Sequence, residues 1–558
     1  MSLVQVTDLS VEFGDLRAVD GLSFRLDQGA ALALVGESGS GKSTVASALL
    51  GLHRGTGTRV GGSIEVAGTD VQQASEDELR RLRGAQAAMV FQDPLSSLDP
   101  YYAIGDQIAE VYRVHTRVSR RAARARAVEV LDRVGIVDAQ RRSRSRPHEF
   151  SGGMRQRALI AMALACEPEL LIADEPTTAL DVTVQAQILD LLHTLREETG
   201  MGLLLVTHDV GVAAESVDEV LVMRHGRVVE HGPVTDVLDA PTEPYTRDLL
   251  AAVPRVDARR TVPGAAPQSA AGSGGIVLPE ASAENARGVS SGASGDVVLE
   301  AAGLRREFGR GKRAFTAVDD VSLTLRRGET LGVVGESGSG KTTLGRMLVG
   351  LLEPTAGEVR YEGHARVGVN PAVQMVFQDP VSSLNLRRSV GESIADPLRA
   401  RGERDEKGIR QRVTELLERV GLEGAHYDRY PHEFSGGQRQ RVGIARALAA
   451  DPRVIVCDEP VSALDVTTQA QVVALLGELQ RELGLALVFV AHDLAVVRQV
   501  SDRVAVMRRG RIVESGPADE VYDNPQEPYT KQLLAAVPAL DPQVAARRRA
   551  VRRELAAA

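Results

Sequence analysis

The stretch VGESGSGKST at residues 35–44 returns almost unchanged as VGESGSGKTT at residues 334–343. Both stretches match the pattern G-x-x-x-x-G-K-[ST], and each follows an apolar run typical of a buried strand. The glycines let backbone N–H groups curve around phosphate oxygens at the start of a helix, whose dipole favours anions. The sequence therefore predicts two phosphate-binding loops, each between a strand and a helix.

Other stretches also occur twice, which indicates a duplication. MVFQDPLSSL at residues 89–98 returns as MVFQDPVSSL at residues 375–384, and 284 residues separate Ser151 from Ser435 and His208 from His492. Between the copies lies a segment rich in Gly, Ser and Ala that has too little apolar surface to fold. We therefore predict a first domain at 1–255, a flexible linker at 256–297, a second domain at 298–540 and an Arg-rich tail at 541–558.

Composition limits the class of protein. Hydrophobic residues make up 43% and charged residues 25% of the 558 residues, which is typical of globular domains. The net charge of −9 gives no general attraction to nucleic acid, and the two cysteines, Cys166 and Cys457, are too few for a disulfide framework. We expect neither an export signal at the N-terminus nor a spanning helix, because the longest apolar stretches, such as 483–491, are too short.

Strand-like and helical segments alternate in each copy. Apolar runs such as ALALV, LLIAD and LLLVT are separated by segments with helical spacing. This alternation predicts an α/β fold with a largely parallel sheet. The segment from about 101 to 146, rich in Ala, Arg and Leu, is predicted to be a helical insertion.

The loops and two pairs of acidic residues predict which side chains bind phosphate and Mg²⁺ and which activate water. Lys42 and Lys341 should reach the β- and γ-phosphates of a nucleotide, while the hydroxyls of Ser43 and Thr342 should bind Mg²⁺. The apolar runs LLIADEP and VIVCDEP deliver Asp174 and Asp458 toward Mg²⁺, and place Glu175 and Glu459 to polarise the attacking water. The alternative for Glu175 is that it only caps the next turn.

The loop residues expected to contact ATP are the following: Gly36, Glu37, Ser38, Gly39, Ser40, Gly41, Lys42, Ser43, Thr44, Gly335, Glu336, Ser337, Gly338, Ser339, Gly340, Lys341, Thr342 and Thr343.

Each copy also carries FSGG ahead of the acidic pair, at 150–153 and 434–437, and with this motif the chain resembles the ATP-binding cassette (ABC) family. The resemblance implies two P-loop ATPase cassettes, each with a parallel core sheet, a helical subdomain and an antiparallel β subdomain. It also implies that the two cassettes pair head to tail, so that each FSGG segment contacts the γ-phosphate bound to the other cassette. The residues concerned are Ser151, Gly152, Gly153, Ser435, Gly436, Gly437 and Gln438.

Further roles are implied by the same resemblance. Gln92 and Gln378 would sense Mg²⁺ and water, His208 and His492 would contact the γ-phosphate, and Asp181 and Asp465 would touch the facing cassette. An aromatic side chain should stack on adenine: Phe13 in the first copy and Phe308 in the second, with Phe315 close enough to compete. The one visible departure is Met154, which stands where the second copy has Gln438. Because both Glu and both His residues are present, we predict two hydrolytic sites.

A closer resemblance is to ATPase subunits of bacterial oligopeptide and dipeptide uptake systems, through PHEFSGGQRQR at 431–441 and a PYT segment at 528–538. It implies ATP and Mg²⁺ as cofactors, two membrane-spanning permease subunits and an extracytoplasmic solute-binding protein. It also implies a peripheral position on the cytoplasmic face of the inner membrane. No self-dimer is required, and no iron–sulfur cluster is expected because no cysteine follows the PYT segments. Peptides are the leading substrates, with glutathione, nickel or sugars behind them.

The alternative function is that of a soluble twin-cassette ATPase that acts on ribosomes or DNA. The Arg-rich stretches at 117–126 and 547–553 could contact nucleic acid, although we interpret both as solvated helix faces. The charged helical linker and the zinc-binding cysteines usual in such proteins are missing from the sequence. We therefore expect no nucleic-acid partner.

Overall fold

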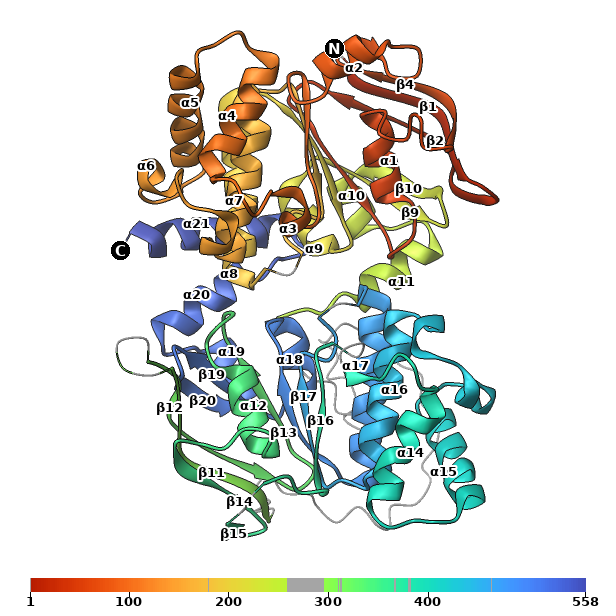
Figure 1. Ribbon diagram of the computed structural model, residues 1–558, viewed down its shortest axis with the longest axis vertical. Coiled ribbons are helices and arrows are strands. Elements are labelled where there is room, and N and C mark those ends of the chain that lie inside the picture. The colour runs from red at the N-terminus through yellow and green to blue at the C-terminus, as the bar shows by residue number, and fades with distance from the viewer. Residues whose placement is uncertain are drawn as a thin grey trace, which may run out of the picture.

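The structure is a computed structural model that describes residues 2–178, 180–257, 296–309, 311, 314–365, 368–379, 383–462 and 464–557. Its elements form two bodies of the same design, one above the other in Figure 1. We call residues 2–257 the first half and residues 296–557 the second half.

The first half contains an antiparallel sheet of strand order β2-β1-β4-β5 and a core sheet of order β10-β9-β3-β8-β7-β6. Its strands are β1 (Ser2–Phe13), β2 (Leu16–Asp27), β3 (Ala31–Val35), β4 (Arg59–Val66), β5 (Thr69–Asp70), β6 (Ala87–Val90), β7 (Leu170–Asp174), β8 (Gly202–Thr207), β9 (Glu219–Arg224) and β10 (Arg227–Pro233). Its α-helices are α1 (Lys42–Leu49), α2 (Glu76–Leu82), α3 (Pro94–Ser97), α4 (Ile104–His115), α5 (Arg120–Arg133), α6 (Ala139–Arg142), α7 (Gly152–Ala163), α8 (Val182–Thr199), α9 (Val210–Ser216), α10 (Val234–Asp239) and α11 (Pro244–Ala252).

The second half repeats this design with sheets of order β12-β11-β14-β15 and β16-β17-β18-β13-β19-β20. Its strands are β11 (Val297–Phe308), β12 (Phe315–Arg326), β13 (Thr330–Val334), β14 (Ala356–Tyr361), β15 (His364–Ala365), β16 (Val373–Val376), β17 (Val454–Asp458), β18 (Ala486–Val490), β19 (Arg503–Arg508) and β20 (Arg511–Pro517). Its α-helices are α12 (Lys341–Val349), α14 (Val390–Ala400), α15 (Glu406–Arg419), α16 (Gly436–Ala449), α17 (Val466–Leu483), α18 (Leu494–Val500), α19 (Ala518–Asp523), α20 (Pro528–Ala536) and α21 (Pro542–Ala557).

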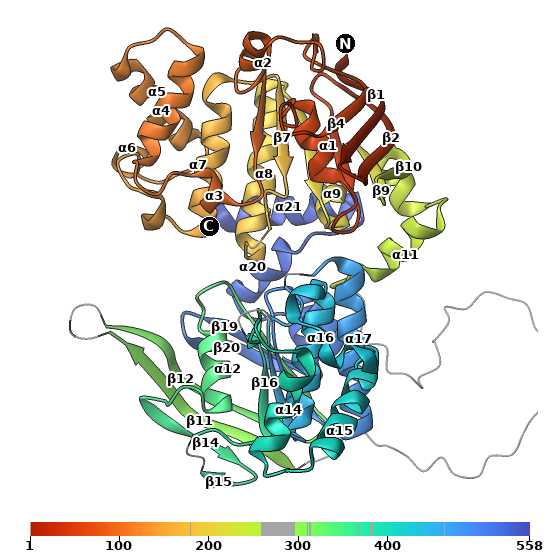
Figure 2. The ribbon, with the colours of Figure 1, turned by 45° about the vertical axis from the view of Figure 1, so that its right-hand side comes forward.

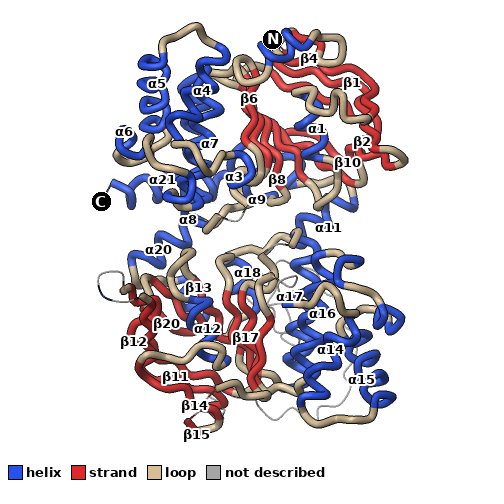
Figure 3. The backbone as a smooth tube through the Cα atoms, in the orientation of Figure 1, coloured by secondary structure: helices blue, strands red, loops and turns tan. Residues whose placement is uncertain are grey.

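The central strands are buried along their whole length because both faces of the core sheet are covered, one by helices and the other by α1 and the antiparallel sheet. Every residue of β3, β7 and β8 is buried, and these strands pair in parallel. A parallel sheet buried on both faces requires such continuous apolar runs rather than an alternating pattern. Figure 3 shows the resulting layers of helix and strand in both halves. The prediction of an α/β fold with two repeated domains that each carry an antiparallel sheet is confirmed.

The predicted helical insertion is also confirmed. Helices α4, α5 and α6 occupy residues 104–142 and form a compact group beside the core sheet (Figure 1). Helices α14 and α15 form the corresponding group in the second half. Of the described helices, none is both long and apolar enough to cross a bilayer.

The C-terminal segment of each half lies against the other half. Helix α11 contacts α17, while α20 contacts α8 and α21 contacts α9. Figure 2 shows α20 and α21, the last elements of the chain, reaching into the first half. These crossings place the two halves with their nucleotide loops toward a common boundary.

Two predictions from the sequence need correction, one for the Arg-rich C-terminal tail and one for the predicted linker. The Arg-rich stretch 547–553 is not simply a solvated helix face, because Arg549 and Arg552 pair with groups of the first half. Most of the predicted linker, residues 258–295, lies outside the described residues. Its first part differs from the prediction, since Val256 is buried in the apolar core of the second half.

Candidate functional site

Each phosphate-binding loop joins a buried strand to a helix, as the motif predicts. In the first half the loop runs from β3 to α1, and Gly41 has a φ of +99°, a conformation that side chains disfavour. A Cβ atom at Gly41 would lie 2.4 Å from the carbonyl oxygen of Ala18, and one at Gly340 would lie 2.3 Å from that of Ala317. The glycines therefore permit a close backbone approach as well as an unusual turn.

The loop lysines lie inside the loops. Lys42 Nζ donates to the carbonyl oxygens of Gly36 and Glu37, both at 2.8 Å, and each lysine is only 5% exposed. Burial lowers the pKa of Lys42. Nearby carboxylates oppose that change, and the strongest opposition comes from Glu175 and Asp174. Lys341 Nζ makes the matching bonds to Gly335 and Glu336 at 2.7 and 2.9 Å. Each ammonium group is thus held over the loop where phosphates would lie.

A hydroxyl and a carboxylate meet at the mouth of each loop. Ser43 Oγ donates to Asp174 Oδ1 at 2.9 Å, and Thr342 Oγ1 donates to Asp458 Oδ1 at 3.0 Å. Burial raises the pKa of both carboxyl groups, and the neighbouring Glu adds to the effect. A bound cation would relieve this unfavourable burial of charge.

These oxygen donors fit Mg²⁺, which keeps several waters and is completed by nucleotide phosphates. The described residues hold no group of three or more His, Cys, Asp or Glu side chains that could bind a metal ion. A magnesium ion would be held by this hydroxyl and this carboxylate together with the substrate, and Gln92 and Gln378 stay candidates for the same ion.

The glutamate after each strand is the centre of a small polar cluster. Gln92 Nε2 donates to Glu175 Oε2 at 2.8 Å, Thr178 Oγ1 donates to the same oxygen at 2.8 Å, and His208 Nδ1 lies 3.2 Å from Glu175 Oε1. Glu175 itself has a φ of +46°, rare for a non-glycine residue. The structure thus brings together three side chains that the sequence selected separately.

The second half repeats this cluster with one change. Gln378 Nε2 donates to Glu459 Oε2 at 2.8 Å, and His492 Nδ1 lies 3.4 Å from the same oxygen. Glu459 has a φ of +47°. Ser462, which stands where the first half has Thr178, donates to the backbone oxygen of Glu459 instead of the carboxylate. Backbone strain at the same position in both halves is typical of a functional site.

The pKa values of the glutamate and the histidine move apart. Burial alone would raise the pKa of Glu175, but the contact with His208 and the bond from Thr178 outweigh it and lower the pKa. The same contact with Glu175 raises the pKa of His208 against the effect of burial. Glu175 is therefore an ionised acceptor, suited to orient a water molecule, beside a histidine that can carry a proton.

The FSGG segments form helix starts. Ser151 is the N-cap of α7 and Ser435 is the N-cap of α16, and the hydroxyl of each accepts a bond from the backbone N–H three residues on. In the second half Gln438 Oε1 also accepts from the backbone N–H of Ser435 at 3.0 Å. Met154 has no group that can repeat this bond, and it packs against the apolar core of the first half. The helices bring Gly152, Gly153, Gly436 and Gly437 to their first turns.

The halves touch through the starts of helices α8 and α17. Thr183 Oγ1 lies 2.7 Å from Oε1 of Glu336, and Thr467 Oγ1 lies 3.0 Å from Oε1 of Glu37. A pocket of about 760 Å³ over the second loop is lined by Ser337, Lys341, Thr343, Gln378, Glu459 and His492 of the second half and by Thr178 and Leu180 of the first. Ser151 is not among the residues that line it. Head-to-tail contact of Ser151 with a bound γ-phosphate therefore stays a prediction.

The aromatic candidates differ between the halves. The centroid of the Phe308 ring lies 4.9 Å from the guanidinium carbon of Arg306 and 5.6 Å from the centroid of Phe315, whose ring is inclined by 25° to that of Phe308. Phe315 is 62% exposed and lines the same pocket as Phe308. Phe13 is 40% exposed, and its ring forms a T-shaped pair with His53 at 5.4 Å between centroids. Because Phe315 is exposed and Phe308 is half-buried, the more accessible stacking face in the second half belongs to Phe315.

Sequence reasoning missed one contact of the loops. The hydroxyl of Tyr245 accepts from the backbone N–H of Glu37 at 3.4 Å, and that of Tyr529 accepts from Glu336 at 3.2 Å. Arg224 and Arg508 each lie 4.6 Å from the ring of the respective tyrosine. The repeated EPYT stretch was the available signal, since a tyrosine kept at equal spacing in both copies marks a contact within each half.

Comparisons with known proteins agree with this geometry. The family model of the ABC transporter matches residues 19–178 and 318–462, and that of the oligopeptide/dipeptide transporter C-terminal region matches residues 229–275 and 513–557. The glutathione import ATP-binding protein GsiA of Salmonella choleraesuis is 47% identical over 97% of this chain and 90% of its own length. Its namesake in Escherichia coli K12 is 46% identical over the same shares.

Proposed function

The chain belongs to the ABC transporter family as an ATP-hydrolysing subunit, and on this premise we propose that it powers the import of peptides, glutathione among them, through separate permease subunits. The observation that carries the proposal is the pair of complete clusters around Glu175 and Glu459, each beside a phosphate-binding loop. The curated relatives are named for glutathione import, and the matched C-terminal region is named for oligopeptide and dipeptide transport.

We propose that hydrolysis proceeds at both clusters. The loop backbone and Lys42 would bind the β- and γ-phosphates, and Ser43 and Asp174 would hold Mg²⁺, which would supply positive charge to the phosphate oxygens. Glu175 accepts a hydrogen bond from the attacking water, and Gln92 and Thr178 fix its carboxylate. His208 faces Glu175 from the next strand and is placed to donate to the γ-phosphate. Lys341, Thr342, Asp458 and Glu459 would act in the same way in the second half.

The surface next to Gln92 has the properties of a binding site for a partner protein. Leu95, Tyr101 and Tyr102 are 60%, 79% and 62% exposed, and such clustered apolar exposure marks interaction sites. A permease segment bound there would act on Gln92 and through it on Glu175. We therefore propose this surface as the permease-docking surface of the first half.

The corresponding surface of the second half has a different chemistry. Arg387 and Arg388 stand where the first half has Tyr101 and Tyr102, and Arg387 is exposed beside Leu386, which is 48% exposed. Arg388 donates to Asp396, so the second surface presents the exposed cation Arg387 where the first presents two tyrosines, and the two surfaces fit different partner segments. This difference supports two unlike permease subunits rather than two copies of one.

Uptake by living cells tests the proposal. Cells that lack this chain would be given labelled dipeptides, longer peptides and glutathione, and then complemented with the wild-type chain or with E175Q/E459Q. We expect the wild-type chain alone to restore uptake of at least one of these solutes. Unchanged uptake of all of them in the deletion strain would contradict peptide import, while sedimentation of the chain with ribosomes or DNA would favour the alternative function.

A further inference from the structure

The last helix of the chain belongs to the second half in sequence but packs on the first half. Helix α21 follows α20, and both cross the boundary to contact α9 and α8. Figures 1 and 2 agree that α21 lies against the helices of the first half. No catalytic role described above involves this helix.

Charge-assisted hydrogen bonds fix α21 in this position. The guanidinium of Arg552 donates to both carboxylate oxygens of Asp190 on α8, at 2.8 and 3.1 Å. Arg549 donates to the backbone oxygen of Glu215 on α9 at 2.6 Å. A two-pronged pair of this geometry is specific as well as strong, because both partners must be correctly oriented.

The groups involved are largely removed from water. The side chain of Arg552 is 10% exposed and that of Glu215 is 2% exposed. The segment before the helix is packed as well, since the backbone N–H of Ala539 donates to Glu215 Oε1 at 3.3 Å. Undocking would break the two hydrogen bonds that Arg552 donates to Asp190, and charge-assisted pairs of this geometry are among the stronger hydrogen bonds in proteins.

The residues that hold α21 in place differ from the residues at the equivalent positions of the other half. At the constant spacing of the repeat, the second half has Ala474 where the first has Asp190, and Gln499 where the first has Glu215. At the same distance beyond its PYT segment, the first half has Ala265 and Gln268 where the second has Arg549 and Arg552. The tail of the second half therefore supplies arginine donors, and the body of the first half supplies the carboxylate acceptors. The reverse combination is missing from the sequence.

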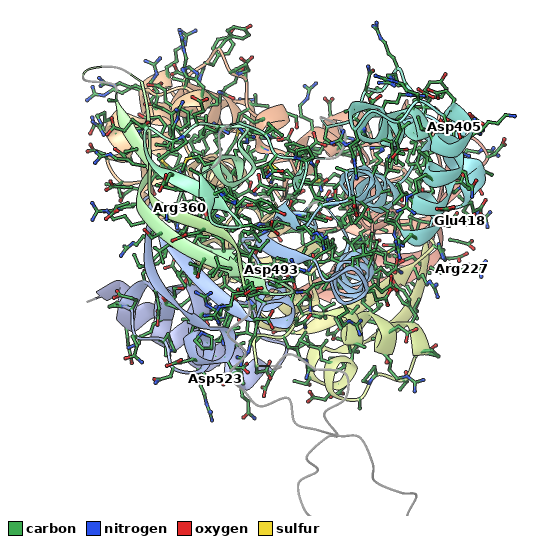
Figure 4. The ribbon with its side chains drawn as sticks, turned by 90° about the horizontal axis from the view of Figure 1, so that it is seen from below. Arg227, Arg360, Asp405, Glu418, Asp493 and Asp523 are labelled. Carbon is green, nitrogen blue, oxygen red and sulfur yellow. The ribbon has the colours of Figure 1, made fainter. Side chains whose placement is uncertain are left out.

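The opposite crossing uses different residues. Arg498 of the second half, 3% exposed, donates to Asp523, labelled in Figure 4, and to the carbonyl oxygen of Val256 at the end of the first half. Its counterpart in the first half is Ala214. Each half thus receives the end of the other through contacts that it cannot make with a copy of itself.

We propose that α21 is an intramolecular docking helix that binds α8 and α9 of the first half and keeps the unlike halves paired when no nucleotide is bound. Its receptor is the pair Asp190 and Glu215. The helix also borders a cavity of about 420 Å³ between the halves, to which Val544 and Arg548 contribute together with His208 and His492. The docked helix thus closes one side of the space between the two catalytic clusters.

Hydrogen–deuterium exchange of the nucleotide-free full-length chain tests the proposal. We expect slow exchange of the α21 amides in the wild-type chain and at least tenfold faster exchange in R552A and in D190A. The double variant D190A/R552A should exchange little faster than either single variant, because both remove the paired hydrogen bonds between Arg552 and Asp190. R547A is the matched control, since Arg547 is exposed on the same helix, and it should behave like the wild type.

The outcomes are decisive in either direction. Fast exchange of α21 in the wild type, or control-like exchange in both R552A and D190A, would overturn the proposal. Protection that grows with protein concentration, with a light-scattering mass of two chains, would also overturn it, since the contact would then join separate copies. Because D190A alters the receptor and R552A the helix, a folding defect of one variant leaves the other as the test.

Discussion

Thr183 of the first half and Glu336 of the second half face each other across the boundary, with Oγ1 and Oε1 2.7 Å apart. The same threonine hydroxyl lies 2.7 Å from Oδ1 of Asp181, so two carboxylates share one hydroxyl proton. Glu336 is part of the second phosphate-binding loop, and its backbone N–H is bonded to Tyr529. One contact therefore links the body of the first half to the nucleotide loop and the C-terminal segment of the second.

Removal of this hydroxyl should impair ATP turnover. T183V keeps the shape of the side chain but leaves Glu336 and Asp181 without the shared proton, and a hydrogen bond to a charged group contributes about 1.5 kcal/mol. We expect roughly a tenfold fall in steady-state ATP hydrolysis, the equivalent of that energy. T199V, at the far end of the same helix, is the control. Equal turnover in T183V and T199V would contradict a functional link across the boundary.

The helix start at Ser435 should be more stable than its counterpart at Ser151. The side chain of Gln438 accepts a hydrogen bond from the backbone N–H of Ser435. Loss of this bond in Q438M should lower the stability of the second half by about 1 kcal/mol, a typical value for a helix cap. M154Q should stabilise the first half by less than Q438M destabilises the second, because Met154 also packs against the apolar core. Denaturant unfolding with probes in each half measures both changes. A Q438M chain as stable as the wild type would argue against the cap.

Adenine in the second half should stack on Phe315. F315A should weaken nucleotide binding at that site roughly tenfold, because stacking of a base on an aromatic ring contributes about 1–3 kcal/mol. F315Y should bind as the wild type does. In the first half Leu16 pairs with Phe13 as Phe315 pairs with Phe308, so L16F should tighten binding there. Titration with a fluorescent nucleotide measures these affinities, and a larger loss for F308A than for F315A would restore Phe308 as the stacking residue.

Glu215 should make the stability of the chain depend on pH. Burial raises its pKa from 4.5 to about 7, although Arg552 and Arg549 on α21 oppose that change, and Asp190 on α8 adds to it. The folded state thus holds a proton that the unfolded state releases, so this group's contribution to stability is full below pH 4.5. It is lost as the pH rises to about 7, by about 3 kcal/mol in all.

E215Q removes this titration. Between pH 4.5 and 7 the melting temperature of the wild type should therefore fall relative to that of E215Q, and the difference should level off above pH 7. E65Q, which alters an exposed glutamate on β4 of the same half, is the control. Parallel melting curves of the wild type and E215Q across this range would contradict the raised pKa.

Much of the fold and of each catalytic cluster could be predicted because the information is local. The loop glycines, the buried strands that end in Asp174 and Asp458, and their order in two copies all lie in short stretches whose geometry follows from the chain itself. Gln92 and His208 are distant from Glu175 in sequence, but they lie at the ends of neighbouring parallel strands, which meet at one edge of the sheet.

The contacts between the halves could not be predicted in this way. Whether Arg552 is solvated or paired depends on which surface α21 meets, and Asp190 lies 362 residues away in sequence. The same holds for Thr183 and Glu336, whose contact needs the relative placement of two separately folded bodies. The stacking of Phe308 on Phe315 depends on how strands β11 and β12 pair, which the order of residues leaves open.

Phosphate release by the purified chain tests the central claim, that Glu175 and Glu459 serve two hydrolytic sites. We predict that E175Q and E459Q each retain part of the wild-type turnover, while E175Q/E459Q falls at least a hundredfold, as expected for loss of a group that orients the attacking water. E65Q, which alters an exposed glutamate on β4, should hydrolyse ATP at the wild-type rate. Near-normal turnover in E175Q/E459Q would contradict the claim.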